Sequence, residues 1–266
     1  MEYRANSREE LSSWLATRQN SPLHVAGSAH ATRDSDQLVM SGLNRIISYE
    51  PEEMIAVAEA GVTVERLNSE LRSKGQWIPT LENNDSATTL GGLLALGTWH
   101  PREQLGAKLR VHVLGGTFCT VDGKLFKSGS RVVKSVAGYD THRAFVGSNG
   151  LLGVIVEVTL KVVPRPEKIV RFMIDAGHRD KVQVAAPLVV EEVEGRLLIE
   201  LGGYEEDVMD DLDKIDGGGL SLLDEAQWES TIALLQAQHS NREPDPTAMR
   251  VLGDLRSAFD PLGLLC

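Results

Sequence analysis

A glycine-spaced stretch that runs directly into a strand pattern constrains the fold most. Glycines stand at 147, 150 and 153, and apolar residues then alternate with more mixed ones from 154 to 163. Alternation with a period of two predicts a strand with one buried face. The dinucleotide fingerprint of doubly wound folds instead requires a helix after its glycines. The order found here therefore excludes that fold and leaves two readings open, a structural turn or a loop beside a ligand.

Short helix and strand patterns alternate through the first part of the chain. Ser7, followed three residues later by a glutamate, forms a capping box that begins a helix. Residues 23–26 (LHVA) read as a strand that ends at Gly27, where backbone amides could face a phosphate. A second amphipathic helix follows Thr63 and ends at Gly75. These patterns predict an α+β protein with several glycine-rich loops.

Two hairpins are also predicted. Residues 45–49 and 54–60 are strand-like and flank a turn that contains Pro51. Asp122-Gly123 separates two further strand patterns, and this dipeptide is a strong hairpin signal.

The composition changes after Pro164-Arg165-Pro166, so we predict a domain boundary near residue 166. The two expected domains are 1–166 and 167–266. The second contains a strand-like run at 196–201 and an acidic run at 205–216 that suits a solvated face. Helices are expected around 224–239 and across 247–259.

Charge and cysteine content exclude several classes of protein. The net charge of −11 argues against a nucleic-acid binder, which needs a basic face. An anionic cofactor remains possible, because a few local amides can hold it. The two cysteines imply no disulfide framework, and no stretch approaches 18 uninterrupted apolar residues. We expect a cytoplasmic protein without a membrane span.

No reaction can be named from the residues alone. The seven histidines do not fall into a metal-ligand spacing, so no metal is expected, and no G-x-S-x-G elbow is present. The catalytic residues stay unknown at this level.

The order of three stretches is more specific than any one motif. They are TLGGLLALG (89–97), LGAKLRVHVLGGTFCTVDGKL (105–125) and VVKSVAGYDTHRAFVGSNGLLGVIVEVTLKVVPRP (132–166). Together they resemble the FAD-binding domain of the vanillyl-alcohol-oxidase (PCMH-type) superfamily. Within it, KSVAGYD is similar to the K-N-V-A-G-Y-D stretch of bacterial glycolate oxidase E subunits. Residues 58–79 and the terminal LRSAFDPLGLLC fit the same pattern.

The resemblance implies a two-subdomain, PCMH-type FAD-binding fold over residues 1–166. Its two α+β subdomains would clamp an extended FAD. Residues 167–266 would then form a shortened cap or substrate-type region, with a C-terminal tail that returns to the FAD domain.

The same resemblance implies which residues meet the cofactor. An early glycine-rich loop would wrap the diphosphate with its amides, the T-x-G-G segment would line the flavin, and the start of the 154–163 strand would lie near the adenine end or the flavin. Gly150 would help to shape that last segment, whereas Tyr139, Asp140 and Arg143 would fix the surrounding fold. The implied cofactor-binding residues are Gly27, Ser28, Ala29, His30, Ala31, Pro79, Thr89, Gly91, Gly92, Gly97, Thr98, Gly153, Val154 and Ile155.

The implied function is an FAD-binding subunit of a glycolate-type 2-hydroxy-acid oxidase or dehydrogenase complex. It would act with partner subunits on a small-molecule substrate, and hydride would pass from the substrate α-carbon to the flavin. The alternative is a non-catalytic partner subunit that keeps the fold but binds FAD weakly or not at all. Two departures from the family pattern motivate it: the loop 27–31 lacks a second glycine and a cation, and Trp99-His100 replaces a small pair. A reductase acting on a sugar nucleotide fits less well, because the K-x-V-A-G-Y-D stretch points elsewhere.

Overall fold

The chain forms two compact units. The computed structural model describes residues 2–18, 21–27, 36–81, 86–105, 108–130, 140–182, 184, 187–215, 219–240 and 246–266. Unit 1 comprises residues 1–98, 109–163 and 243–266, and unit 2 comprises residues 99–108 and 164–242. Each unit therefore contains segments that are distant in the sequence. None of the described helices is long and apolar enough to cross a membrane.

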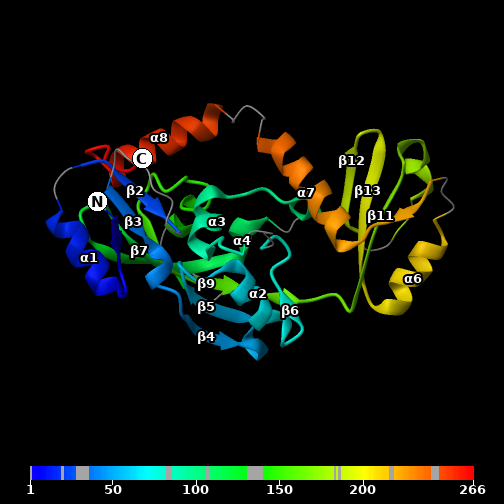
Figure 1. Ribbon diagram of the computed structural model, residues 1–266, viewed down its shortest axis with the longest axis horizontal. Helices are drawn as coiled ribbons and strands as arrows, with labels where there is room; N and C mark the ends of the chain where they lie inside the picture. The colour runs from blue at the N-terminus through cyan, green and yellow to red at the C-terminus, as the bar shows by residue number, and fades with distance from the viewer. Residues whose placement is uncertain are drawn as a thin grey trace. The chain divides into compact units, whose positions relative to one another are not determined.

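A three-stranded parallel sheet with the order β1-β3-β2 opens unit 1 (Figure 1). Helix α1 connects the first two strands, and the Ser7 hydroxyl accepts from the Glu10 amide at 3.1 Å, which confirms the predicted N-cap; the Glu10 carboxylate accepts from the Asn6 amide. The C-terminal tail contacts this sheet through an isolated parallel bridge between Leu265 and Leu23 of β2. These elements are β1 (Glu2–Arg4), α1 (Arg8–Thr17), β2 (Leu23–Ala26) and β3 (Asp36–Val39).

A five-stranded antiparallel sheet, in the order β4-β5-β9-β7-β8, forms the second subdomain of unit 1. Both predicted hairpins are confirmed, β4–β5 through a short 3-10 turn and β7–β8 through Asp122-Gly123. The predicted alternating strand is β9, and its valines face the hydrophobic core. The strands are β4 (Ile46–Glu50), β5 (Ile55–Glu59), β7 (Val113–Cys119), β8 (Leu125–Gly129) and β9 (Val154–Lys161).

Helices of unit 1 pack around the core that this sheet shares with the parallel sheet. Ala56, Ala58 and Ala60 of the β5 segment lie in that core, where their small side chains leave room for helices. The Thr63 hydroxyl caps α2 by accepting from the Arg66 amide, as the sequence predicts. The helices are α2 (Val64–Arg72), α3 (Leu90–Leu96), α4 (Leu109–His112), α5 (Thr141–Ala144) and α8 (Pro246–Phe259), with the short strands β6 (Gln76–Trp77) and β10 (Val163–Pro164).

Unit 2 is a four-stranded antiparallel sheet, in the order β12-β13-β11-β14, with a helix on each face (Figure 1). Alternate residues of β13 face opposite cores: Ile199 lies with Val208 of α6, and Leu198 lies with Trp228 of α7. The predicted strand at 196–201 and helix at 224–239 are thus confirmed. The elements are β11 (Lys168–Asp175), β12 (Pro187–Val193), β13 (Arg196–Gly203), β14 (Ser221–Leu222), α6 (Glu205–Asp213) and α7 (Glu225–Ser240).

A buried ion pair organises the interior of unit 2. Arg102 and Glu200 are 1% and 0% exposed, and the guanidinium Nε and Nη2 donate to the two carboxylate oxygens at 2.6 and 2.7 Å. Arg171 donates to the same carboxylate at 2.9 Å and lies 4.6 Å from the Trp228 ring centre. Because a buried charge is tolerated only when it is paired, this network holds residues 99–105 to the unit-2 sheet.

Candidate cofactor site

Helix α3 is the element around which the predicted cofactor residues of unit 1 gather. Thr89 is its N-cap, and the Thr89 hydroxyl accepts from the Gly92 amide at 3.2 Å. The Gly91 amide donates to the Ala60 carbonyl at 2.7 Å. A Cβ on Gly91 would lie 2.7 Å from the Ala60 Cβ, so only glycine lets the helix approach the end of β5 this closely.

The end of β2 meets the beginning of α3. A Cβ on Gly27 would lie 2.1 Å from the Thr89 Oγ1, which places the Gly27 backbone directly against the cap. Gly27 and Gly92 are both half-buried, so part of their backbone surface is accessible. Two segments that the family resemblance assigns to the cofactor are therefore adjacent in space.

The other end of α3 contacts the glycine loop that precedes β9. Gly97 caps the helix in the left-handed conformation (φ +59°), and a Cβ there would lie 2.6 Å from the Gly147 Cα. The Gly147 amide donates to the Leu94 carbonyl at 2.9 Å, and the Asn149 amide donates to the Ala95 carbonyl at 2.8 Å. The family resemblance does not assign Gly147 to the cofactor, although its place in the series of glycines at 147, 150 and 153 indicates a close contact.

The predicted residues at the start of β9 are buried. Gly153 has φ +140°, and a Cβ there would lie 2.6 Å from the Cys119 carbonyl oxygen. Val154 and Ile155 are 0% and 6% exposed and pair with the end of β7. Burial raises the pKa of the Cys119 thiol to about 12, so this neighbour is unreactive at neutral pH.

Two further predicted residues lie apart from these contacts. Pro79 stands in a turn in which the Leu81 amide donates to the Ile78 carbonyl. The hydroxyl of the adjacent Thr80 is buried and has no hydrogen-bond partner among the described residues. A buried unsatisfied hydroxyl is costly, and a bound ligand is one way to satisfy it. Thr98 is half-buried and ends the first segment of unit 1.

The remaining predictions concern residues 28–31, Tyr139 and Trp99. Ser28, Ala29, His30 and Ala31 lie outside the described residues, as does Tyr139. Trp99 belongs to unit 2, where its ring stacks on His239 with centroids 4.4 Å apart. Its carbonyl accepts from the Gln236 side chain at 3.0 Å.

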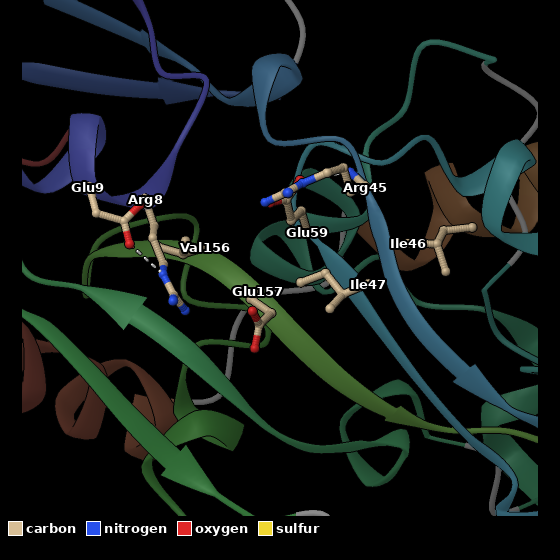
Figure 2. Close-up of a pocket in the computed structure, with 8 residues that line it drawn as sticks. All are labelled: Arg8, Glu9, Arg45, Ile46, Ile47, Glu59, Val156 and Glu157. Carbon is tan, nitrogen blue, oxygen red and sulfur yellow. Dashed lines mark hydrogen bonds and ion pairs between the residues drawn. The ribbon is translucent and has the colours of Figure 1, made fainter.

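A charged hollow of about 390 Å³ on the five-stranded sheet is separate from these glycines (Figure 2). Arg45 forms an ion pair with Glu59 there, with 2.7 Å between Nη2 and Oε1. This hydrogen-bonded contact raises the Arg45 pKa. Glu157 stands directly opposite Glu59 in the β5–β9 register. Two opposed carboxylates repel a diphosphate, and none of the predicted cofactor residues lines this hollow.

The residues around α3 fit a flat ring better than a phosphate. The Gly91 and Gly92 amides already donate within the protein, to Ala60 and Thr89. The accessible backbone at Gly91, Gly92 and Gly97 can still approach an aromatic ring without side-chain interference.

Comparison with known proteins gives a family match for this part of the chain. Residues 3–129 match a protein family described as an FAD binding domain. The matched FAD binding domain includes Gly27 and the whole of α3, so the contacts described above lie inside it.

Curated relatives of the chain include two proteins named as subunits of glycolate oxidase. Glycolate oxidase subunit GlcE of Escherichia coli (strain K12) is 38% identical over 122 residues, covering 46% of this chain and 35% of that protein. Glycolate oxidase subunit GlcD of Bacillus subtilis (strain 168) is 26% identical over 256 residues, covering 84% of this chain and 54% of that protein. The chain thus spans between about a third and about half of these two relatives.

Solved structures support the fold over most of the chain. Two structures of alkyldihydroxyacetonephosphate synthase match with TM-scores of 0.69 and 0.66, at 14% and 16% identity. The matches cover 99% and 90% of this chain, and 75% and 55% of those chains. The predicted α+β, PCMH-type FAD-binding fold is therefore confirmed.

Proposed function

We propose that the protein binds FAD and works as the flavin-carrying subunit of a glycolate-type 2-hydroxy-acid oxidase or dehydrogenase complex. The observation that carries this proposal is the contact of Gly27 with Thr89. It joins the end of β2 to the start of α3, two segments that were assigned to the cofactor on separate motifs. Both segments lie in the matched family region.

Each part of the site would have its own task. Amides of residues 28–31 would hold the diphosphate, and the glycine surface at 91, 92 and 97 would lie beside the flavin ring. Gly153–Ile155 are buried, so they would act by holding the neighbouring loop rather than by touching the cofactor. FAD bound there would supply the acceptor for the hydride of a 2-hydroxy acid. We assign no catalytic base.

Partner subunits are part of the proposal. The chain spans 35% of GlcE and 54% of GlcD, and both relatives are named as subunits of glycolate oxidase. Unit 2 would serve as a reduced cap, and residues that bind the substrate would come partly from other chains. We place the complex in the cytoplasm, because both cysteines, Cys119 and Cys266, are free thiols.

The second candidate is a non-catalytic partner subunit that keeps the fold without firm FAD binding. Two observations favour it. The Gly91 and Gly92 amides are engaged within the protein, so they offer no donors to a cofactor. Trp99, in place of a small residue, stacks on His239 instead of being held free for a flavin.

FAD addition separates the two candidates. The purified protein is scanned for flavin absorbance, then titrated with FAD while its melting temperature is followed. A ligand that binds only the folded state stabilises it by about 2.7 kcal/mol at a hundredfold excess over its Kd. The proposal expects yellow protein and a raised melting temperature, and a colourless protein that FAD does not stabilise favours the non-catalytic subunit.

A further inference from the structure

Four phenylalanine rings form one cluster inside unit 1. Phe118 of β7 and Phe145, which ends α5, are buried, and their ring centres lie 4.4 Å apart. Phe126 of β8 packs at 5.7 Å from Phe118. Phe259, the last residue of α8, meets Phe145 edge-on at 5.8 Å and Phe126 at 6.0 Å. Edge-to-face contact is a favoured aromatic geometry, so Phe259 makes a specific contact with the cluster.

Phe145 supports the glycine loop before β9 at both ends. Its carbonyl accepts from the Ser148 amide at 3.3 Å and from the Ser148 hydroxyl at 3.0 Å. A Cβ on Gly153 would lie 3.4 Å from the Phe145 Cε1, so the ring lies against the start of β9. The Gly147 amide ties the same loop to α3. The loop conformation therefore depends on where Phe145 stands.

Helix α8, which carries Phe259, has no fully buried residue. Its contact with the core consists of the half-buried Leu252, Leu255 and Phe259. Because stabilisation by burial scales with the apolar area removed from water, this stripe alone holds the helix weakly. The helix relies on the segment that follows it.

That segment is anchored by polar contacts. Asp260 is 3% exposed and accepts from the amides of Leu264 and Leu265 at 2.9 and 2.8 Å. Arg256 donates to the Leu265 carbonyl at 2.7 Å. The Leu23 amide of β2 donates to the Leu264 carbonyl at 2.6 Å. The tail thus fixes the end of α8, and with it Phe259, to the strand that leads to Gly27.

We infer that residues 246–266 brace the cofactor loop, with Phe259 as a positioning residue. Phe259 acts through Phe145, whose ring and carbonyl hold residues 147–153. The inference rests on the proposed function, because this loop is expected to face FAD. A loop that is already held in its binding conformation has less entropy to lose when the ligand binds, so the brace increases FAD affinity.

Substitutions on α8 test the brace. Phe259→Ala removes the ring, Phe259→Tyr keeps one, and Val251→Ala is a matched control at a position 48% exposed on the same helix. FAD dissociation constants are measured by flavin fluorescence at a temperature where circular dichroism shows each variant folded. Phe259→Ala should raise the constant about tenfold, and the other two should stay within about twofold of wild type. If the alanine variant is unfolded, Phe259→Leu replaces it, because leucine keeps apolar bulk without a ring.

Hydrogen exchange of the cofactor-free protein separates this inference from the proposed function. Amides of residues 145–153 should exchange faster in Phe259→Ala than in Val251→Ala, since a local opening there costs less. A wild-type protein that fails to bind FAD overturns the proposed function, and the exchange comparison still tests the brace. Unchanged exchange in this segment overturns the brace, as does wild-type FAD affinity of Phe259→Ala in a protein that binds FAD.

Discussion

At the scale of the residue, the glycines of the candidate site are required by close contacts within the protein itself. Gly27 lies against Thr89, Gly91 against Ala60, and Gly97 against Gly147. Each contact would be broken by a single added Cβ. The same glycines thus pack closely against the protein and leave a surface without side chains, so that packing and the proposed cofactor binding would require the same residue type.

Gly97 and Gly75 provide a matched test of this point. Both have a left-handed backbone, with φ +59° and +66°, but an added Cβ meets Gly147 at 2.6 Å in the first case and nothing within 4 Å in the second. Gly75→Ala should cost about 1–2 kcal/mol of unfolding free energy from strain alone. Gly97→Ala should cost about 1–3 kcal/mol more, because backbone must move. Urea denaturation measures both, and equal losses would show that α3 does not need close approach at this end.

At the scale of the element, the buried carboxylate of β13 is the strongest single constraint on unit 2. Glu200→Gln removes the buried carboxylate that Arg102 and Arg171 share, so it should cost about 3–5 kcal/mol of unfolding free energy. Lys168→Met removes an exposed ion pair with Glu205 in the same unit and should cost less than about 1 kcal/mol. Chemical denaturation followed by tryptophan fluorescence compares them. A Glu200→Gln loss as small as that of Lys168→Met would contradict a structural role for the network.

His100 makes this network sensitive to acid. Burial, and then the guanidinium groups of Arg102 and Arg171, hold the His100 pKa well below its usual 6.5. The folded state thus keeps a neutral ring, whose Nδ1 accepts from the Arg102 amide at 3.2 Å, whereas the unfolded state takes up a proton below that pH. Stability is therefore fully present above about pH 6.5 and falls as the pH drops toward the folded pKa.

His100→Gln should weaken this pH dependence. Glutamine can accept the same hydrogen bond but binds no proton in either state. Melting temperatures recorded between about pH 7.5 and 5 should decline less steeply in His100→Gln than in wild type. Parallel curves would assign the acid sensitivity to other groups, such as His112 and His142, whose pKa values burial also lowers.

At the scale of the whole molecule, local elements were predictable and long-range assembly was not. Strand β9, the Asp122-Gly123 hairpin and α8 follow from periodicity and turn chemistry, because those signals lie in adjacent residues. The sequence does not predict that residues 99–108 belong to unit 2, because Glu200, the ion-pair partner of Arg102, lies far along the chain. The contact of Gly27 with Thr89 was equally hidden, since glycine contacts leave no hydrophobic pattern.

The central claim is that the FAD binding domain holds FAD at the glycine surface around α3. Its most direct test is FAD titration of wild type beside Gly97→Ala and Gly75→Ala, followed by flavin absorbance after removal of free cofactor. Wild type and Gly75→Ala should retain FAD, and Gly97→Ala should lose most of it while remaining folded. Retention by none of the three, or equal retention by all three, would contradict the claim.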